Sequence, residues 1–125
     1  MPKYALVVMS DPGEPNPGMQ GRMVHAMSAA RDLRAAGQDA SLWFHGIGVM
    51  WLSAMDSRMD PFTRHYGKLF DEVKDLIGGA CEFCAVKRFG AGPSAESSGV
   101  TLLGGGDEHH SIAALIADGH DVTIF

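Results

Sequence analysis

The chain contains two cysteines, Cys81 and Cys84, and only two residues separate them in the stretch GGACEFCAVKRFG. A disulfide between such near neighbours closes too small a loop to act as the staple of a secreted scaffold. In a reducing compartment, a Cys-x-x-Cys pair is more often catalytic, redox-active or metal-binding. Three interpretations of the pair are open at this point: thiol or persulfide chemistry, binding of a soft metal, and two buried thiols that only fill space.

The surroundings of the two cysteines favour a reactive thiol. Cys81 is expected at the end of a strand, and Cys84 in the first turn of the next helix, where free backbone N–H groups and the helix dipole stabilise a thiolate. Lys87 and Arg88 follow closely and add positive charge. We therefore expect at least one thiol to be accessible and to have a pKa below the ordinary value of about 8.5, unless burial outweighs these effects.

A second candidate stretch, GGGDEHH at residues 104–110, combines acids and imidazoles that metals can bind. Glycines are typical of a turn, and Asp107 and Glu108 are residue types favoured at the start of a helix. Metal ligation by His109 or His110 would need partners from other loops, and the Cys-x-x-Cys pair supplies only two of the four ligands of a structural zinc site. The sequence therefore assigns no metal and no cofactor.

Segments typical of strands and helices alternate along the chain. Apolar runs predict strands at residues 3–9, 39–45, 80–83, 100–104 and 120–125, and helical periodicity predicts helices at 21–36, 46–55, 62–77, 84–89 and 111–117. Asp60 and Pro61 are suited to the start of the clearest helix, and Gly78-Gly79 to its end. The stretches 10–18 and 92–99 are expected to be loops. Val122, Ile124 and Phe125 are expected to be buried in the final strand.

This alternation predicts an α/β fold, a three-layer α/β/α sandwich with a mainly parallel five-stranded sheet, in one domain over residues 1–125. Open sheets of this kind bind ligands at the carboxyl ends of their strands. The loops at 10–21, 45–49 and 81–84 should therefore form the site. The candidate ligand-binding residues are Asp11, His45, Gly46, Gly48, Lys87 and Arg88.

Charge and composition exclude several classes of protein. The net charge is −5 and the pI is about 5.6, whereas binding to nucleic acid or to an anionic membrane needs a basic surface. No apolar run approaches the roughly 20 residues of a membrane-spanning helix. The first residues, MPKYALVVMSDPGEPN, lack the pattern of a signal peptide, so we expect a cytoplasmic protein.

Three stretches in this order, SDPGEPNPGMQGRMVHAM, FHGIGVMWL and GACEFCAVKRFG, resemble the DsrE/DsrF-like proteins of sulfur metabolism, and the likeness runs from Lys3 to Phe125. The resemblance implies the DsrE/F-like version of the three-layer fold and a homotrimer or hexamer. It also implies a persulfide-carrying cysteine in the loop after the third strand, a role that carries over to Cys81 or Cys84.

The expected function is therefore sulfur handling by a possible sulfurtransferase or sulfur carrier. One cysteine would accept a sulfane sulfur from a donor protein and pass it to a thiol of an acceptor protein. The alternative is a non-catalytic oligomeric protein that binds a small ligand or a soft metal in the same crevice.

Overall fold

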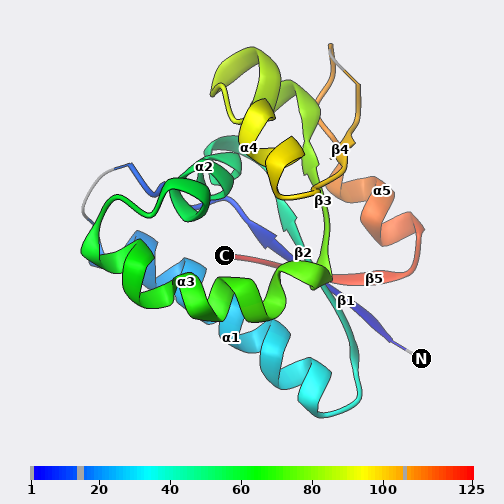
Figure 1. Cartoon of the computed structure of the whole chain (residues 1–125). Helices are drawn as coiled ribbons and strands as arrows, with labels where there is room; N and C mark the ends of the chain where they lie inside the picture. The colour runs from blue at the N-terminus through cyan, green and yellow to red at the C-terminus, as the bar shows by residue number, and fades with distance from the viewer. Residues whose placement is uncertain (1, 14–15, 106) are drawn as a thin grey trace.

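Five parallel strands form one sheet in the order β4-β3-β2-β1-β5 (Figure 1). The structure is a computed structural model that describes residues 2–13, 16–105 and 107–125. Glu14 and Pro15 of the predicted loop and Gly106 of the predicted glycine turn lie outside the described residues. The strands are β1 (Lys3–Val8), β2 (Asp39–Phe44), β3 (Ile77–Cys81), β4 (Leu102–Leu103) and β5 (His120–Ile124). The predicted α/β fold with five strands is thus confirmed, and the described sheet is parallel throughout.

Helices cover both faces of this sheet, an arrangement consistent with three layers (Figure 1). The α-helices are α1 (Pro17–Ala35), α2 (Met50–Ser57), α3 (Pro61–Val73), α4 (Gly92–Ser97) and α5 (Ile112–Ala117). Two short 3₁₀ helices, η1 (Gly46–Val49) and η2 (Lys74–Leu76), and a π-helix, η3 (Phe83–Arg88), complete the described elements.

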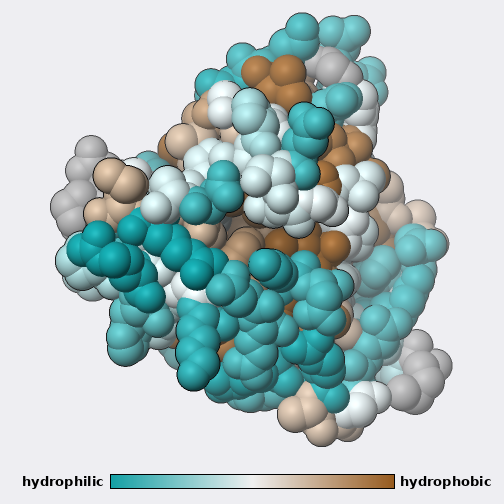
Figure 2. Space-filling model, in the orientation of Figure 1, coloured by the Kyte–Doolittle hydropathy of each residue, from teal (hydrophilic) through white to brown (hydrophobic). Residues whose placement is uncertain are grey.

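The alternation of side chains along β1 divides the interior into two parts. Leu6 and Val8 face the larger core beneath α1, α2 and α3, whereas Ala5 and Val7 face a smaller cluster with Leu115 of α5. Successive strand residues point to opposite faces, so one strand contributes to both cores. The surface over α1 and α3 is mainly hydrophilic (Figure 2), as expected for helices with one buried face.

The helix boundaries follow from their caps. Asp60 accepts a hydrogen bond from the Thr63 N–H at 2.7 Å, and the Thr63 hydroxyl faces the Asp60 N–H, so the predicted start of α3 is confirmed with a reciprocal cap. Helix α1 begins four residues before the predicted Gly21, because Asn16 caps it and Pro17 fits the first position.

The prediction that Gly78 and Gly79 end a helix was wrong, since both lie inside β3. A Cβ on Gly78 would lie 2.4 Å from the Trp43 ring, and one on Gly79 would lie 2.4 Å from Leu103 Cδ1. The two glycines are therefore needed where side chains of the neighbouring strands cross the β3 backbone.

Two further expectations were wrong. Residues 92–99 contain helix α4 instead of a loop, because Pro93 suits a first turn and Ala95 is fully buried against the larger core. Ile124 is 54% exposed instead of buried, because β5 lies at the edge of the sheet. Phe125 is half-buried and its N–H donates to Val7 O at 2.7 Å. Among the described residues, no helix has both the length and the apolar character needed to cross a membrane.

Candidate functional site

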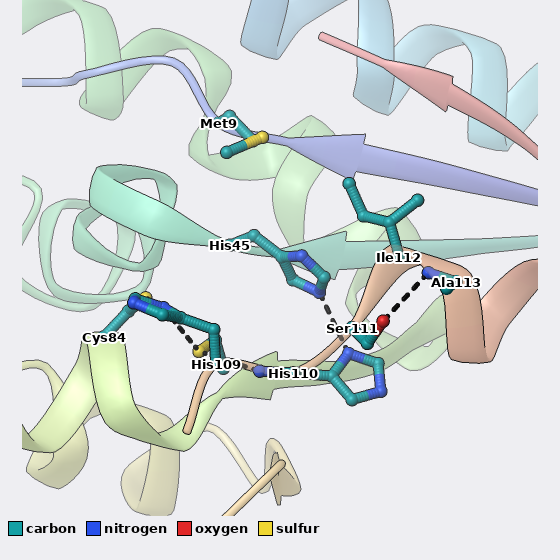
Figure 3. Close-up of a pocket in the computed structure, with 9 residues that line it drawn as sticks. Met9, His45, Cys84, His109, His110, Ser111, Ile112 and Ala113 are labelled. Carbon is teal, nitrogen blue, oxygen red and sulfur yellow. Dashed lines mark hydrogen bonds between the residues drawn. The ribbon is translucent and has the colours of Figure 1, made fainter. Parts of the chain in front are cut away.

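The carboxyl ends of β1, β2 and β3 meet at a pocket of about 350 Å³ (Figure 3). Met9, His45 and Cys81 lie at these three strand ends, and Cys84 follows in η3. The loop before α5 and the first two residues of α5 supply the rest of the lining, residues 109–113. Of the three loops expected to form the site, 45–49 and 81–84 contribute His45, Cys81 and Cys84 to this pocket, whereas none of the described residues of 10–21 lines it.

Cys81 and Cys84 lie side by side on the inner wall of this pocket. Cys81 is the last residue of β3, and Cys84 is the second residue of the π-helix η3, a rare helix type that is often found at functional sites. Both are free thiols, with exposed fractions of 0% and 1%. Direct contact with bulk water is therefore minimal at either sulfur.

His109 is the third member of this group. Its Nδ1 lies 3.1 Å from Cys84 Sγ and 3.8 Å from Cys81 Sγ. The Phe83 ring packs edge-on against the imidazole, with 4.5 Å between ring centroids. One imidazole nitrogen therefore faces both sulfurs, although the His109 side chain as a whole is exposed.

His110 connects the thiols to the strand ends. Its backbone N–H donates to Cys81 Sγ at 3.4 Å, and its Nδ1 lies 3.0 Å from Nε2 of the buried His45. Burial, followed by the charges of His110 and His109, lowers the pKa of His45 to about 4. Burial also lowers the pKa of His110. Both rings are therefore neutral at neutral pH, and one donates a hydrogen bond to the other.

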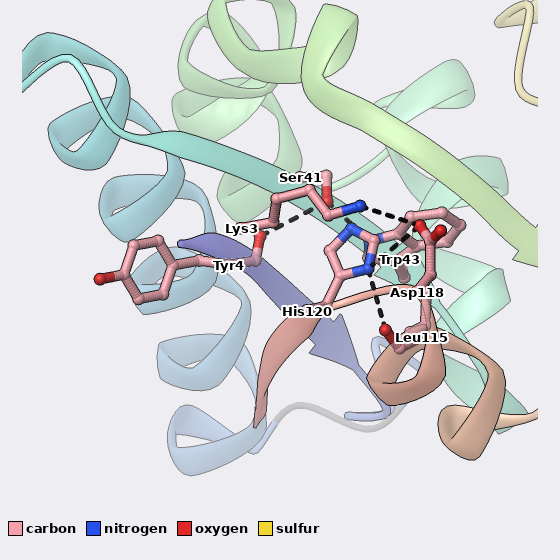
Figure 4. A network of polar contacts seen from close by, with 7 residues as sticks. All are labelled: Lys3, Tyr4, Ser41, Trp43, Leu115, Asp118 and His120. Atoms are coloured by element: carbon pink, nitrogen blue, oxygen red, sulfur yellow. Dashed lines mark hydrogen bonds and ion pairs between the residues drawn. The ribbon is translucent and has the colours of Figure 1, made fainter. Parts of the chain in front are cut away.

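Trp43 packs against His110, and its indole also contacts Ser41 and His120 (Figure 4). The two rings are stacked, with centroids 5.8 Å apart and planes inclined by 14°, and the His120 ring makes an edge-to-face contact with the indole. Trp43 Nε1 donates to Ser41 Oγ at 2.8 Å. The indole is therefore held from three directions, and it supports the residue that donates to Cys81.

The expectation of an accessible thiol was wrong for both cysteines, which are 0% and 1% exposed, and the expectation of a lowered pKa was wrong for Cys84. Burial raises the pKa of its thiol to about 11, and a hydrogen bond with Cys81 acts in the same direction. A backbone hydrogen bond from Gly46 and the charge of Arg88 oppose this shift but are weaker. Desolvation of the thiolate thus outweighs the Gly46 hydrogen bond and the charge of the nearby Arg88.

Gly46 and Gly48 serve the site through their backbone. Gly46 has a φ of +56°, in the left-handed region that favours glycine. A Cβ on Gly48 would lie 2.1 Å from Val8 O, so η1 can approach the end of β1 only with glycine at this position. These residues therefore set the close packing of strand ends around the thiols and His45.

Three other predicted residues do not join the pocket. Asp11 and Arg88 line a separate hollow, where the Asp11 carboxylate accepts a hydrogen bond from Gly13 N–H at 2.7 Å. Lys87 is exposed. The Arg88 guanidinium lies 5.0 Å from the centre of the Phe89 ring, and its charge acts to lower the pKa of the Cys84 thiol.

Sequence reasoning missed the contribution of the loop before α5. Asp107 and Glu108 were expected at a helix start, but α5 begins at Ile112 with Ser111 as its cap. The earlier residues are consequently free to run past the cysteines. The sequence signal for this contribution was the pair His109-His110. Either histidine was expected to bind a metal only together with residues from other loops.

Comparisons with models of known protein families, with curated proteins and with solved structures find no match to this chain.

Proposed function

We propose that this domain handles sulfur, accepting a sulfane sulfur on Cys84 as a persulfide and passing it to a partner thiol. The observation that carries the proposal is the 3.1 Å contact between Cys84 Sγ and His109 Nδ1 at the wall of a pocket. A thiol whose pKa is raised by burial needs a proton acceptor in order to react. His109 is placed to be that acceptor, and its closer approach to Cys84 than to Cys81 favours Cys84 as the nucleophile.

The transfer is balanced without an external oxidant. Cys84 gives its proton to His109 Nδ1, and its thiolate attacks the outer sulfur of a donor persulfide, R–S–SH. The donor S–S bond breaks, its electron pair leaves on the donor thiolate, and that thiolate takes the proton from His109. Cys84 now carries the persulfide, and the thiolate of an acceptor attacks its outer sulfur to regenerate Cys84.

The family resemblance supports the same proposal, since a persulfide cysteine after the third strand is what the DsrE/DsrF-like pattern implies. We also propose the homotrimer or hexamer and the cytoplasmic location that accompany this pattern. Exposed apolar side chains outside the pocket, such as Ile116 at 58% and Ile124 at 54%, offer surface for an interface between copies.

The test is mass spectrometry of reduced, chelator-treated protein after exposure to glutathione persulfide. We expect each chain to gain one sulfur atom, and a dithiol acceptor to remove it. Cys84→Ser should lose the adduct, whereas Cys81→Ser should keep it. His109→Ala should slow the gain, and His25→Ala, which removes an exposed histidine on α1, should not. An adduct that forms equally on Cys84→Ser, or does not form at all, would refute the proposal.

A further inference from the structure

The two cysteines and His109 have the geometry of a metal-binding site as well as of a nucleophile. Their three ligand atoms all lie within 4.8 Å of one another. In a tetrahedral zinc site with bonds of about 2.3 Å to sulfur and about 2.0 Å to nitrogen, the sulfur–nitrogen edge is about 3.5 Å. The distances of 3.1 Å and 3.8 Å from His109 Nδ1 to the two sulfurs lie on either side of that value.

We propose that Cys81, Cys84 and His109 bind Zn²⁺, with the fourth coordination position facing the pocket. Two thiolates and one imidazole are ligands that zinc prefers, and three protein ligands with one open position are typical of catalytic zinc sites. The predicted absence of a metal rested on the Cys-x-x-Cys pair supplying two ligands, and His109 is the third.

Charge balance favours a divalent ion here over a monovalent one. Both sulfurs are buried, and two thiolates without a counter-charge would be strongly disfavoured in this surrounding. Zn²⁺ brings the sum of ion and thiolates to zero, whereas Cu⁺ would leave one buried negative charge. Zinc therefore replaces the two thiol protons with no net charge left at the wall of the pocket.

Groups around the three ligands hold them in place. The His110 N–H donates to Cys81 Sγ, a contact that stabilises a thiolate ligand. Phe83 packs against the His109 ring and limits its rotation. His110 Nδ1 pairs with His45, so the fourth position is left to water or to a small ligand in the pocket. Such outer contacts commonly change metal affinity by about 10–100-fold.

This inference does not rest on the proposed sulfur transfer, although both use Cys84. A thiolate bound to zinc is not free to carry a persulfide, so the two occupants exclude each other on one chain. The metal-loaded protein should therefore gain no sulfur, and removal of zinc by a chelator should restore the gain.

The test uses reduced, chelator-treated protein titrated with Zn²⁺ and, as a spectroscopic probe, with Co²⁺. We expect one metal ion per chain by native mass spectrometry. Co²⁺ should give the intense visible bands of a tetrahedral ion and a thiolate-to-metal charge-transfer band in the near ultraviolet. Cys84→Ser should weaken the charge-transfer band, and His109→Ala should lower the affinity by at least about tenfold. The exposed-histidine control, His25→Ala, should bind as the parent does.

Circular dichroism checks that each variant is folded, and Cys81→Ser replaces Cys84→Ser if the latter is not. Metal retention that is unchanged in both a folded cysteine variant and His109→Ala would overturn the site, as would failure of the parent to retain either ion. The two proposals fail separately: a persulfide adduct without metal binding leaves sulfur transfer alone, and a cobalt spectrum without an adduct leaves the zinc site alone.

Discussion

Replacement of Gly78 by alanine tests the packing that supports the site. The new methyl group would lie 2.4 Å from Trp43 Cζ2, and ordinary contact begins at 3.4 Å, so the indole has to move by about 1 Å. Trp43 Nε1 donates a hydrogen bond to Ser41 Oγ, and the indole ring stacks on the imidazole of His110. The indole therefore cannot move away from β3 without displacing His110, whose N–H donates to Cys81 Sγ.

The expected loss of stability follows from two opposing effects. Overpacking of a well-filled site destabilises by about 1–3 kcal/mol. Replacing glycine with alanine restricts the unfolded chain and returns about 0.4–1 kcal/mol. The net loss is about 1–2 kcal/mol, which lowers the Tm of a domain of this size by about 4–8 °C.

The assay is thermal unfolding followed by circular dichroism, with Gly21→Ala as the matched control. Gly21 lies inside α1, and a Cβ there would meet nothing within 4 Å. Because alanine has the higher helix propensity, this control should raise the Tm, by about 2–4 °C. A Gly78→Ala protein that melts at or above the parent temperature would show that Trp43 does not cross β3 as described.

Three other outcomes are expected. In reduced, metal-free protein, iodoacetamide should label Cys84 slowly at neutral pH and faster as the pH rises toward about 11; rapid labelling at pH 7 would contradict the raised pKa. The Arg58 guanidinium lowers the pKa of Asp71 in the folded state, so the pair stabilises above the unfolded carboxyl pKa of about 3.9, and this contribution is lost as the pH falls through the lower folded pKa. The Tm difference between parent and Asp71→Asn should accordingly be small at pH 7, because the pair is partly exposed, and should vanish in acid. Light scattering should show a homo-oligomer; a monomer at micromolar concentration would contradict the proposed trimer or hexamer.

The sheet and most helices could be predicted because their signals are local. An unbroken apolar run identifies β1, and Asp60-Pro61 marks the start of α3 without reference to any other part of the chain. The glycines of β3 could not be read in the same way. Gly78 is needed because of the Trp43 ring of β2, and Gly79 because of the Leu103 side chain of β4. Both contacts exist only after the strands have paired.

The part of the candidate site at the strand ends could be predicted from the sequence, but the part formed by the loop before α5 could not. His45 and Cys84 follow strands and Cys81 ends one, and the rule for parallel sheets brings such positions together. His109 follows no strand directly and is 25 residues from Cys84, so its contact depends on the path of an irregular loop. The ionisation of Cys84 was misjudged for a related reason, since burial depends on the whole fold whereas the helix end and Arg88 are visible in the sequence.

The short strand β4 precedes the loop that places His109 and His110 next to the thiols, and few contacts hold β4 to the sheet. Only two of its residues pair with β3, and one further backbone hydrogen bond, from Ala80 N to Thr101 O at 2.9 Å, ties the start of this segment to the sheet. Few contacts mean a low free energy of local opening, well below that of global unfolding. Such an opening would move His109 and His110 away and expose both sulfurs while β1, β2 and α1 stay folded. At a pH where the thiols ionise readily, the rate of cysteine modification therefore reports the opening of this loop. That rate should depend little on denaturant and little on the global stability of the domain.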